Sequence, residues 1–126
     1  MAEVPLVSII DNSDSVGWAV AAVIGSSGFR ALVFPSAEEF IQSDQMSCTA
    51  CLIVEVQLPG MSGLQLQSHL ASTGRHIPMI FIAASAHQAD QKLAFELGAI
   101  SLRDKPSGDR ALLQAIRLIL KPGDKG

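Results

Sequence analysis

Three polar side chains that could do chemistry follow two short apolar runs. Asp11 and Asn12 come directly after Leu6–Ile10, and Glu55 comes directly after Leu52–Val54. Short apolar runs of this kind are typical of strands buried on both faces, and open α/β sheets bind ligands at the carboxyl ends of such strands. The two carboxylates should therefore share one cleft, where a hard cation or a cationic side chain would offset their repulsion.

The elements that must position these side chains alternate between strand and helix. This alternation predicts an α/β fold, with a parallel sheet, right-handed crossovers and helices on both faces. With five strands we expect the flavodoxin-like order 2-1-3-4-5, which also brings Ala83 and Lys105 to neighbouring strand ends. The predicted strands are Leu6–Ile10, Phe29–Phe34, a run ending at Glu55, Met79–Ala83 and Ile100–Arg103, and the predicted helices are Val16–Ile24, Ser36–Ser43, Ser62–Ser72, one ending near Leu97, and Ser107–Leu120.

The helix ends and faces carry further predictions. Ser13 or Asp14 should cap the first helix, and Ser36 to Glu39 should form a capping box. We expect the leucines at 64, 66 and 70 to face the core, together with the apolar residues at 112, 113, 116, 119 and 120. On the first helix, the residues at 18, 21, 22 and 25 should face outward.

Composition limits the class of protein. The chain has 126 residues, of which 48% are hydrophobic and 17% charged, so it can bury a real core and is not a disordered chain. A formal net charge of −3 argues against direct nucleic-acid binding. The sequence shows neither a membrane-spanning run nor a signal peptide, so we expect a cytoplasmic protein that does not bind membranes.

Cysteines, histidines and a flavin site are weaker candidates. Cys48 and Cys51 form a C-x-x-C, but a redox pair needs its first cysteine at a helix start and here a strand follows, which predicts two unpaired thiols. The histidines at 69, 76 and 87 lack metal-ligand spacing. A flavin phosphate requires a loop of free N–H groups after the first strand, whereas Asp11 and Asp14 would repel it.

Several segments together resemble the receiver domain of bacterial response regulators, over roughly Val7 to Leu120. The similarity is greatest to receivers that precede a helix-turn-helix DNA-binding domain. The resemblance implies the CheY-like version of the fold and a place in two-component phosphorelay signalling. It is carried by IIDN (9–12), FPSAEEF (34–40), CLIVEVQLPGMSGLQL (51–66), IPMIFI (77–82), LGA (97–99) and DKP (104–106).

The family's site residues are only partly present. In the family, acids after strand one hold magnesium, an aspartate ending strand three accepts phosphate from a histidine kinase, and a hydroxyl residue and a lysine contact the phosphoryl group. Asp11 and Lys105 match, as does Pro106, but Asn12 replaces the second acid and Glu55 the acceptor. Ala83 replaces the hydroxyl residue, and Leu102 occupies the aromatic switch position.

These departures imply a degenerate receiver locked in one state, in which a Glu55–Lys105 ion pair replaces phosphate and metal. Asp11, Glu55 and the carbonyl of Gln57 are weak candidates for magnesium ligands, and we expect no other cofactor. We expect no enzymatic activity. The alternatives are a receiver that a histidine kinase still phosphorylates, and a flavodoxin-like small-molecule or redox module.

Partner surfaces are predicted at three large apolar side chains, Trp18, Phe95 and Leu118. We expect a homodimer through the fifth strand with its flanking helices, or through the first and last helices. A histidine kinase and a fused DNA-binding output domain are further expected partners. Residues 1–121 should form the receiver-like domain, and residues 122–126 a tail or the beginning of a linker.

Overall fold

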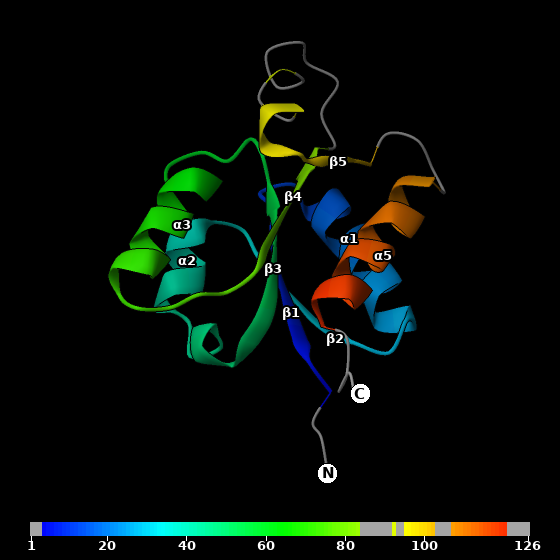
Figure 1. The fold of residues 1–126 in the computed structure, drawn as a ribbon, viewed down its shortest axis with the longest axis horizontal. Coiled ribbons are helices and arrows are strands. Elements are labelled where there is room, and N and C mark those ends of the chain that lie inside the picture. The colour runs from blue at the N-terminus through cyan, green and yellow to red at the C-terminus, as the bar shows by residue number, and fades with distance from the viewer. Residues whose placement is uncertain (1–3, 84–91, 93–94, 103–106, 121–126) are drawn as a thin grey trace.

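The computed structural model describes residues 4–83, 92, 95–102 and 107–120. These residues form a three-layer α/β sandwich, with α1 and α5 on one face of the sheet and α2 and α3 on the other (Figure 1). Along the chain the elements are β1 (Leu6–Ile10), α1 (Asp14–Ser26), β2 (Arg30–Phe34), α2 (Ala37–Gln42), the 3₁₀ turn η1 (Met46–Cys48), β3 (Thr49–Glu55), α3 (Gly63–Ser72), β4 (Met79–Ala83), β5 (Ile100–Ser101) and α5 (Ser107–Ile119).

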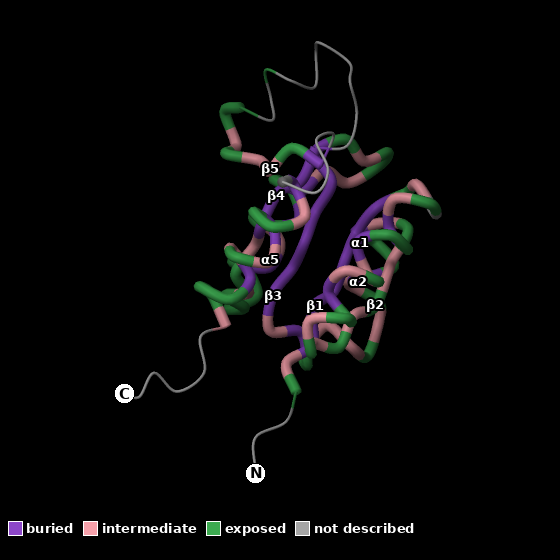
Figure 2. The backbone as a smooth tube through the Cα atoms, turned by 90° about the vertical axis from the view of Figure 1, so that its right-hand side faces the viewer, coloured by how far each residue is buried: buried purple, intermediate pink, exposed green. Residues whose placement is uncertain are grey.

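The sheet is parallel, and its strand order is β2-β1-β3-β4-β5, which confirms the predicted topology. All five residues of β1 are buried, and so is nearly all of β3, because helices cover both faces of these central strands. Figure 2 shows this buried band running between the helical layers. None of the helices described is long and apolar enough to cross a bilayer.

Alternation along β3 divides the interior into two cores. Cys51 and Ile53 contribute to a core with residues of α1 and α5, whereas Leu52 and Val54 contribute to a core with residues of α2 and α3. Successive side chains of a strand point to opposite faces, so an uninterrupted apolar run serves both layers. This arrangement explains why the sequence of β3 lacks the polar alternation of a half-exposed strand.

Two helix caps form, and the one at Ser36 was predicted. The Ser62 hydroxyl accepts from the Gln65 N–H (3.1 Å) while the Gln65 side chain accepts from the Ser62 N–H (2.9 Å), so α3 begins with a full capping box. Ser36 accepts from the Glu39 N–H (3.1 Å) at the start of α2. Ser13, predicted with Asp14 as an alternative, occupies the N-cap position of α1, but its side chain makes no capping hydrogen bond, and Asp14 is the first residue of the helix.

Other predictions need correction at the edges of elements. Leu64 and Ile119 were expected in the core but are 45% and 37% exposed, because each lies at the border of its helix's apolar stripe. Ala21 was expected to face outward, yet it packs partly against the core of α1 and α5. Strand β5 has two residues, and the predicted extension to Arg103 lies outside the described residues, as does most of the predicted fourth helix.

Candidate functional site

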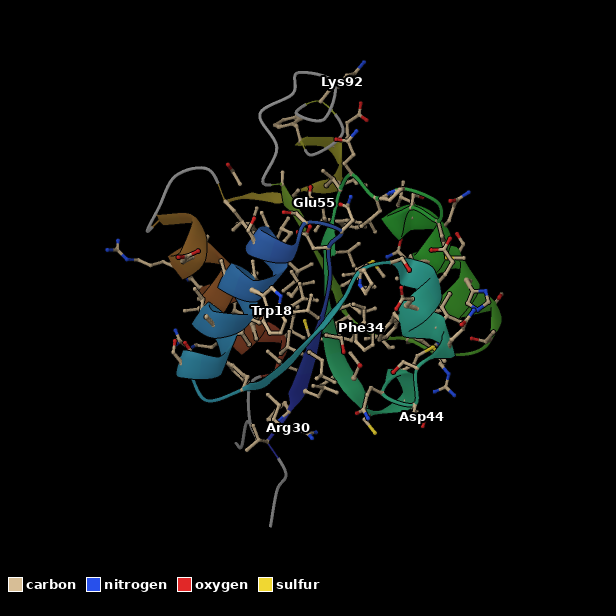
Figure 3. All side chains as sticks on the ribbon, turned by 180° about the vertical axis from the view of Figure 1, so that it is seen from behind. Trp18, Arg30, Phe34, Asp44, Glu55 and Lys92 are labelled. Carbon is tan, nitrogen blue, oxygen red and sulfur yellow. The ribbon has the colours of Figure 1, made fainter. Side chains whose placement is uncertain are left out.

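An acidic cavity of about 520 Å³ opens at the carboxyl edge of the sheet. The parallel register pairs Ile10 with Val54, so the next residues, Asp11 and Glu55, leave neighbouring strands side by side. Figure 3 shows Glu55 at the end of β3, beside the turn that leads into α1. The cavity is lined by residues that follow β1 (Asp11, Asn12, Ser13 and Val16) and residues that end or follow β3 (Glu55, Gln57, Leu58 and Pro59).

Asp11 is held in this cavity by backbone contacts. It is only 2% exposed, its N–H donates to the Phe34 carbonyl (3.0 Å), and its Oδ1 accepts from the Ser13 N–H (2.8 Å). Among the described residues its Oδ2 has no hydrogen-bond partner. Burial raises the pKa of Asp11, and the hydrogen bond from Ser13 opposes that rise only in part.

Glu55 is almost as deeply buried, at 5% exposure. Its strand pairing with Ile82 of β4 fixes its backbone, and the following N–H, of Val56, donates to the Ile82 carbonyl (3.0 Å). The predicted ion pair between Glu55 and Lys105 stays a prediction, because Lys105 and Pro106 lie outside the described residues.

Ala83 and Leu102 do not line the cavity but lie in the two cores. Ala83, at the end of β4, is 8% exposed and belongs to the core of α2 and α3. Leu102 is 5% exposed in the core of α1 and α5, beside Leu112 and Ile116. Its N–H donates to the Ala83 carbonyl (2.9 Å), which ties the two positions together. Neither side chain can donate a hydrogen bond to an oxyanion.

The turn between β3 and α3 is anchored by a residue that the sequence did not single out for this role. Glu38, at the start of α2, accepts from the Met61 N–H through its Oε2 (2.9 Å). At Gly60 the backbone has a φ of +73°, and a Cβ there would lie 2.8 Å from the same oxygen. Because Glu38 and Met61 are 23 residues apart in the sequence, no local sequence pattern predicts this contact.

The donors present suit a hard cation only weakly. Asp11 Oδ2 is a buried carboxylate oxygen that a cation would satisfy, and Gln57 lines the same cavity. However, Asn12 is exposed and neutral, and no group of three or more histidine, cysteine, aspartate or glutamate side chains gathers in the described part of the chain. Magnesium strongly prefers carboxylate oxygens, so this donor set predicts weak binding.

The structure opposes a redox role for the cysteines. Both thiols are free, as predicted, with Cys48 exposed in the 3₁₀ turn and Cys51 buried in β3. Burial raises the pKa of Cys51 to about 12, whereas a redox-active cysteine needs a lowered pKa. His69 and His76 belong to no metal-ligand group, and His87 lies outside the described residues.

Comparison with known proteins identifies the family. The family model of the response regulator receiver domain matches residues 7–117. The chain belongs to the response regulator receiver family. This confirms the resemblance noted in the sequence and explains why its acids meet at one strand edge.

Relatives include transcription regulators. The response regulator protein TmoT of Ectopseudomonas mendocina is 38% identical over 117 residues, which cover 92% of this chain and 53% of TmoT. The transcriptional regulatory protein FixJ of Azorhizobium caulinodans is 31% identical, with 90% and 54% covered. The chain thus spans about half the length of these relatives.

Solved structures agree with the fold. The response regulator StyR superimposes with a TM-score of 0.73 at 32% identity, covering 94% of this chain and 60% of that one. The structure titled FixJ-N superimposes with a TM-score of 0.70 at 26% identity, covering 94% of each chain. Both comparisons cover nearly the whole of this chain.

Proposed function

We propose that this receiver acts in two-component signalling as a protein-interaction module that does not depend on phosphorylation. The observation that carries the proposal is Glu55, a buried glutamate at the strand end where the family places its acceptor aspartate. A glutamate is one methylene longer than aspartate, so its carboxylate extends toward the space that a phosphoryl group would occupy. It thereby keeps a carboxyl group in that space whether or not a phosphoryl donor is present.

The surroundings of Glu55 support the same proposal. The methyl group of Ala83 replaces a hydroxyl donor and is packed in the core, so it offers nothing to a phosphoryl oxygen. Leu102 is already turned inward among Leu112 and Ile116, where it has no polar group that would respond to charge. A receiver with these features should hold one conformation whatever the state of its cavity.

Phosphoryl uptake tests the proposal directly. The purified chain is incubated with acetyl phosphate or phosphoramidate and magnesium, and its intact mass is measured; we expect no added phosphoryl group. The matched control is the triple variant Asn12→Asp, Glu55→Asp and Ala83→Thr, which restores the family's residues and should gain one phosphoryl group. A gain of one phosphoryl group by the unmodified chain would contradict the proposal and favour a receiver that a histidine kinase still phosphorylates.

Magnesium binding gives a second readout. Because Asn12 removes one carboxylate, calorimetric titration of the unmodified chain should show weak binding. Titration of the Asn12→Asp variant should show tighter binding. A tight, stoichiometric signal from the unmodified chain would contradict the argument from the donor set.

Self-association through the outer face of α1 is the proposed mode of interaction. Trp18 is 68% exposed, and α1 carries no charged residue from Ser15 to Ser26. An uncharged face can meet its own copy without repulsion, and an exposed tryptophan suits an interface anchor. Phe95, at 87% exposure, is an alternative anchor near β5. By analogy with its longer relatives, a DNA-binding output domain is a proposed partner.

Trp18 is also the sole tryptophan, so its fluorescence reports on this surface. With rising protein concentration we expect a blue shift of the emission together with dimer formation in sedimentation. Ala22→Glu, which places a charge on the same exposed face, should prevent both changes. Leu64→Glu, a charge at an exposed leucine of α3, is the control and should leave them intact. A monomer in sedimentation at high micromolar concentration would contradict self-association through α1.

A further inference from the structure

A second cavity of the described residues lies away from the acidic site. It is a groove of about 820 Å³ lined by residues of α5 and by the residues that precede β1 and β2. Its apolar surface comes from Pro5, Phe29, Leu113, Leu118 and Leu120. Leu118 is 68% exposed, which is unusual for a large aliphatic side chain with apolar neighbours.

The charged residues of this groove all have one sign. Arg110 and Arg117 line it, both are exposed, and the described residues that line it include no acidic one. Arg30 follows Phe29 directly and donates through Nε to the Val4 carbonyl (3.1 Å), beside Pro5. The described residues include five of the chain's nine arginines and lysines, and three of these five line the groove or lie next to it. Among the described residues, basic charge is therefore concentrated near this groove.

The spacing along α5 matches recognition of a helix. Arg110, Leu113, Arg117 and Leu118 stand at positions i, i+3, i+7 and i+8, so they form one stripe along two turns. At 1.5 Å per residue the two arginines are about 10 Å apart along the axis, close to the diameter of a helix with its side chains. Grooves that accept an amphipathic helix present anchors in this periodicity.

We propose that this groove binds an amphipathic helix of a partner protein whose apolar stripe is flanked by acidic residues. Its leucine-like side chains would cover Leu113 and Leu118, while its carboxylates would face Arg110 and Arg117. A second copy of the same groove is disfavoured as the occupant, since a symmetric contact would set arginine against arginine. A concave groove also suits a helix better than it suits a flat lipid surface.

This inference extends the proposed function by specifying the chemistry of a partner, and it does not depend on whether Glu55 accepts phosphate. Failure of one is thus distinguishable from failure of the other, because phosphoryl uptake and helix binding are measured separately. The probe is a fluorescein-labelled, helix-stapled peptide of two heptads, with leucine at positions a and d and glutamate at e and g. A peptide with lysine in place of glutamate is its matched control.

Fluorescence anisotropy with the purified chain should show binding of the glutamate peptide that weakens as salt is added. The double variant Arg110→Glu and Arg117→Glu should weaken binding about tenfold or more, since each change removes an attraction and adds a repulsion. Arg75→Glu, at an exposed arginine outside the groove, should not weaken it. Leu118→Gln should also weaken binding, whereas Leu64→Gln, an exposed leucine on α3, should not.

Circular dichroism confirms that each variant is folded. The inference is overturned if the unmodified chain does not bind the glutamate peptide, or if the lysine peptide binds equally well. It is also overturned if the arginine reversals leave binding unchanged. Binding of phosphatidylglycerol vesicles that depends on the same arginines, without binding of the peptide, would assign the groove to a membrane surface and reject the helix.

Discussion

Replacing Asp11 by asparagine should stabilise the folded receiver at neutral pH. The carboxylate is 2% exposed, and its Oδ2 has no hydrogen-bond partner among the described residues. It also lines the same cavity as Glu55. Asparagine has nearly the same size and keeps the oxygen that accepts from the Ser13 N–H at 2.8 Å. The substitution thus removes the charge and keeps the turn.

The magnitude follows from the extra cost of burying an unpaired charge instead of an unpaired neutral polar group; the neutral group alone costs about 1 to 3 kcal/mol, and the charge adds an amount of that order. Removing the charge should raise the free energy of unfolding by an amount in that range, and each kcal/mol should raise the midpoint of thermal unfolding by about 4 °C. Asp11→Ala should stabilise less than Asp11→Asn, because alanine also loses the acceptor for the Ser13 N–H.

The pH dependence has a definite sign. Burial raises the pKa of Asp11 above its ordinary value, so this group favours folding least when it is ionised. Its contribution is most favourable below the unfolded pKa of aspartate, about 3.9, and is lost as the pH rises through the folded pKa. The stability difference between Asp11→Asn and the unmodified protein should therefore be small near pH 3 and reach its full value at neutral pH.

Urea unfolding followed by circular dichroism measures this difference, across a pH series that contains a chelator to exclude metal ions. Asp44→Asn, at an exposed aspartate, is the control and should change the unfolding free energy by no more than a few tenths of a kcal/mol. The reasoning is refuted if Asp11→Asn is no more stable than the unmodified protein at neutral pH, or if its advantage is the same near pH 3.

Two further predictions concern packing and thiol reactivity. Gly63→Ala should lower the free energy of unfolding by about 1 to 3 kcal/mol, because its Cβ would lie 2.5 Å from the Phe81 ring. Gly25→Ala, with open space around it, is the control and should raise the free energy of unfolding by about 0.5 to 1 kcal/mol. Equal effects of the two variants in urea unfolding would contradict the role of the Phe81 contact. A thiol reagent at pH 8 should label only Cys48 in the folded protein, since burial raises the pKa of Cys51 to about 12; mass spectrometry showing two labels before unfolding would contradict this.

Local sequence signals predicted the fold well. The limits of β1 and β4 were predicted correctly, because each is a compact apolar run between residues that end strands. The meeting of Asp11 and Glu55 followed from topology alone, since parallel strands in this order end at one edge. The errors lay where a residue sits at the border of an apolar stripe, as Leu64 and Ile119 do. There, the depth of neighbouring side chains decides exposure, and periodicity carries no information about it.

Contacts between distant segments could not be predicted. The groove beside α5 depends on Phe29 and Pro5 approaching Leu113, which requires the sheet to be assembled first. In the sequence, Arg110 and Arg117 look like ordinary solvent-facing residues of an amphipathic helix. Their shared location with exposed leucine becomes visible only when α5 is placed against the start of β2.

The contact between Glu38 and the β3–α3 turn has a consequence for how this receiver's sequence can change. A side chain at position 60 would occupy the place of the Glu38 carboxylate, and the φ of +73° there already disfavours one. Loss of Glu38 would instead leave the Met61 N–H to water, while making room at position 60. The two positions should therefore covary among descendants of this sequence: a bulkier residue should appear at position 60 only where Glu38 has been shortened, although the two lie on different elements.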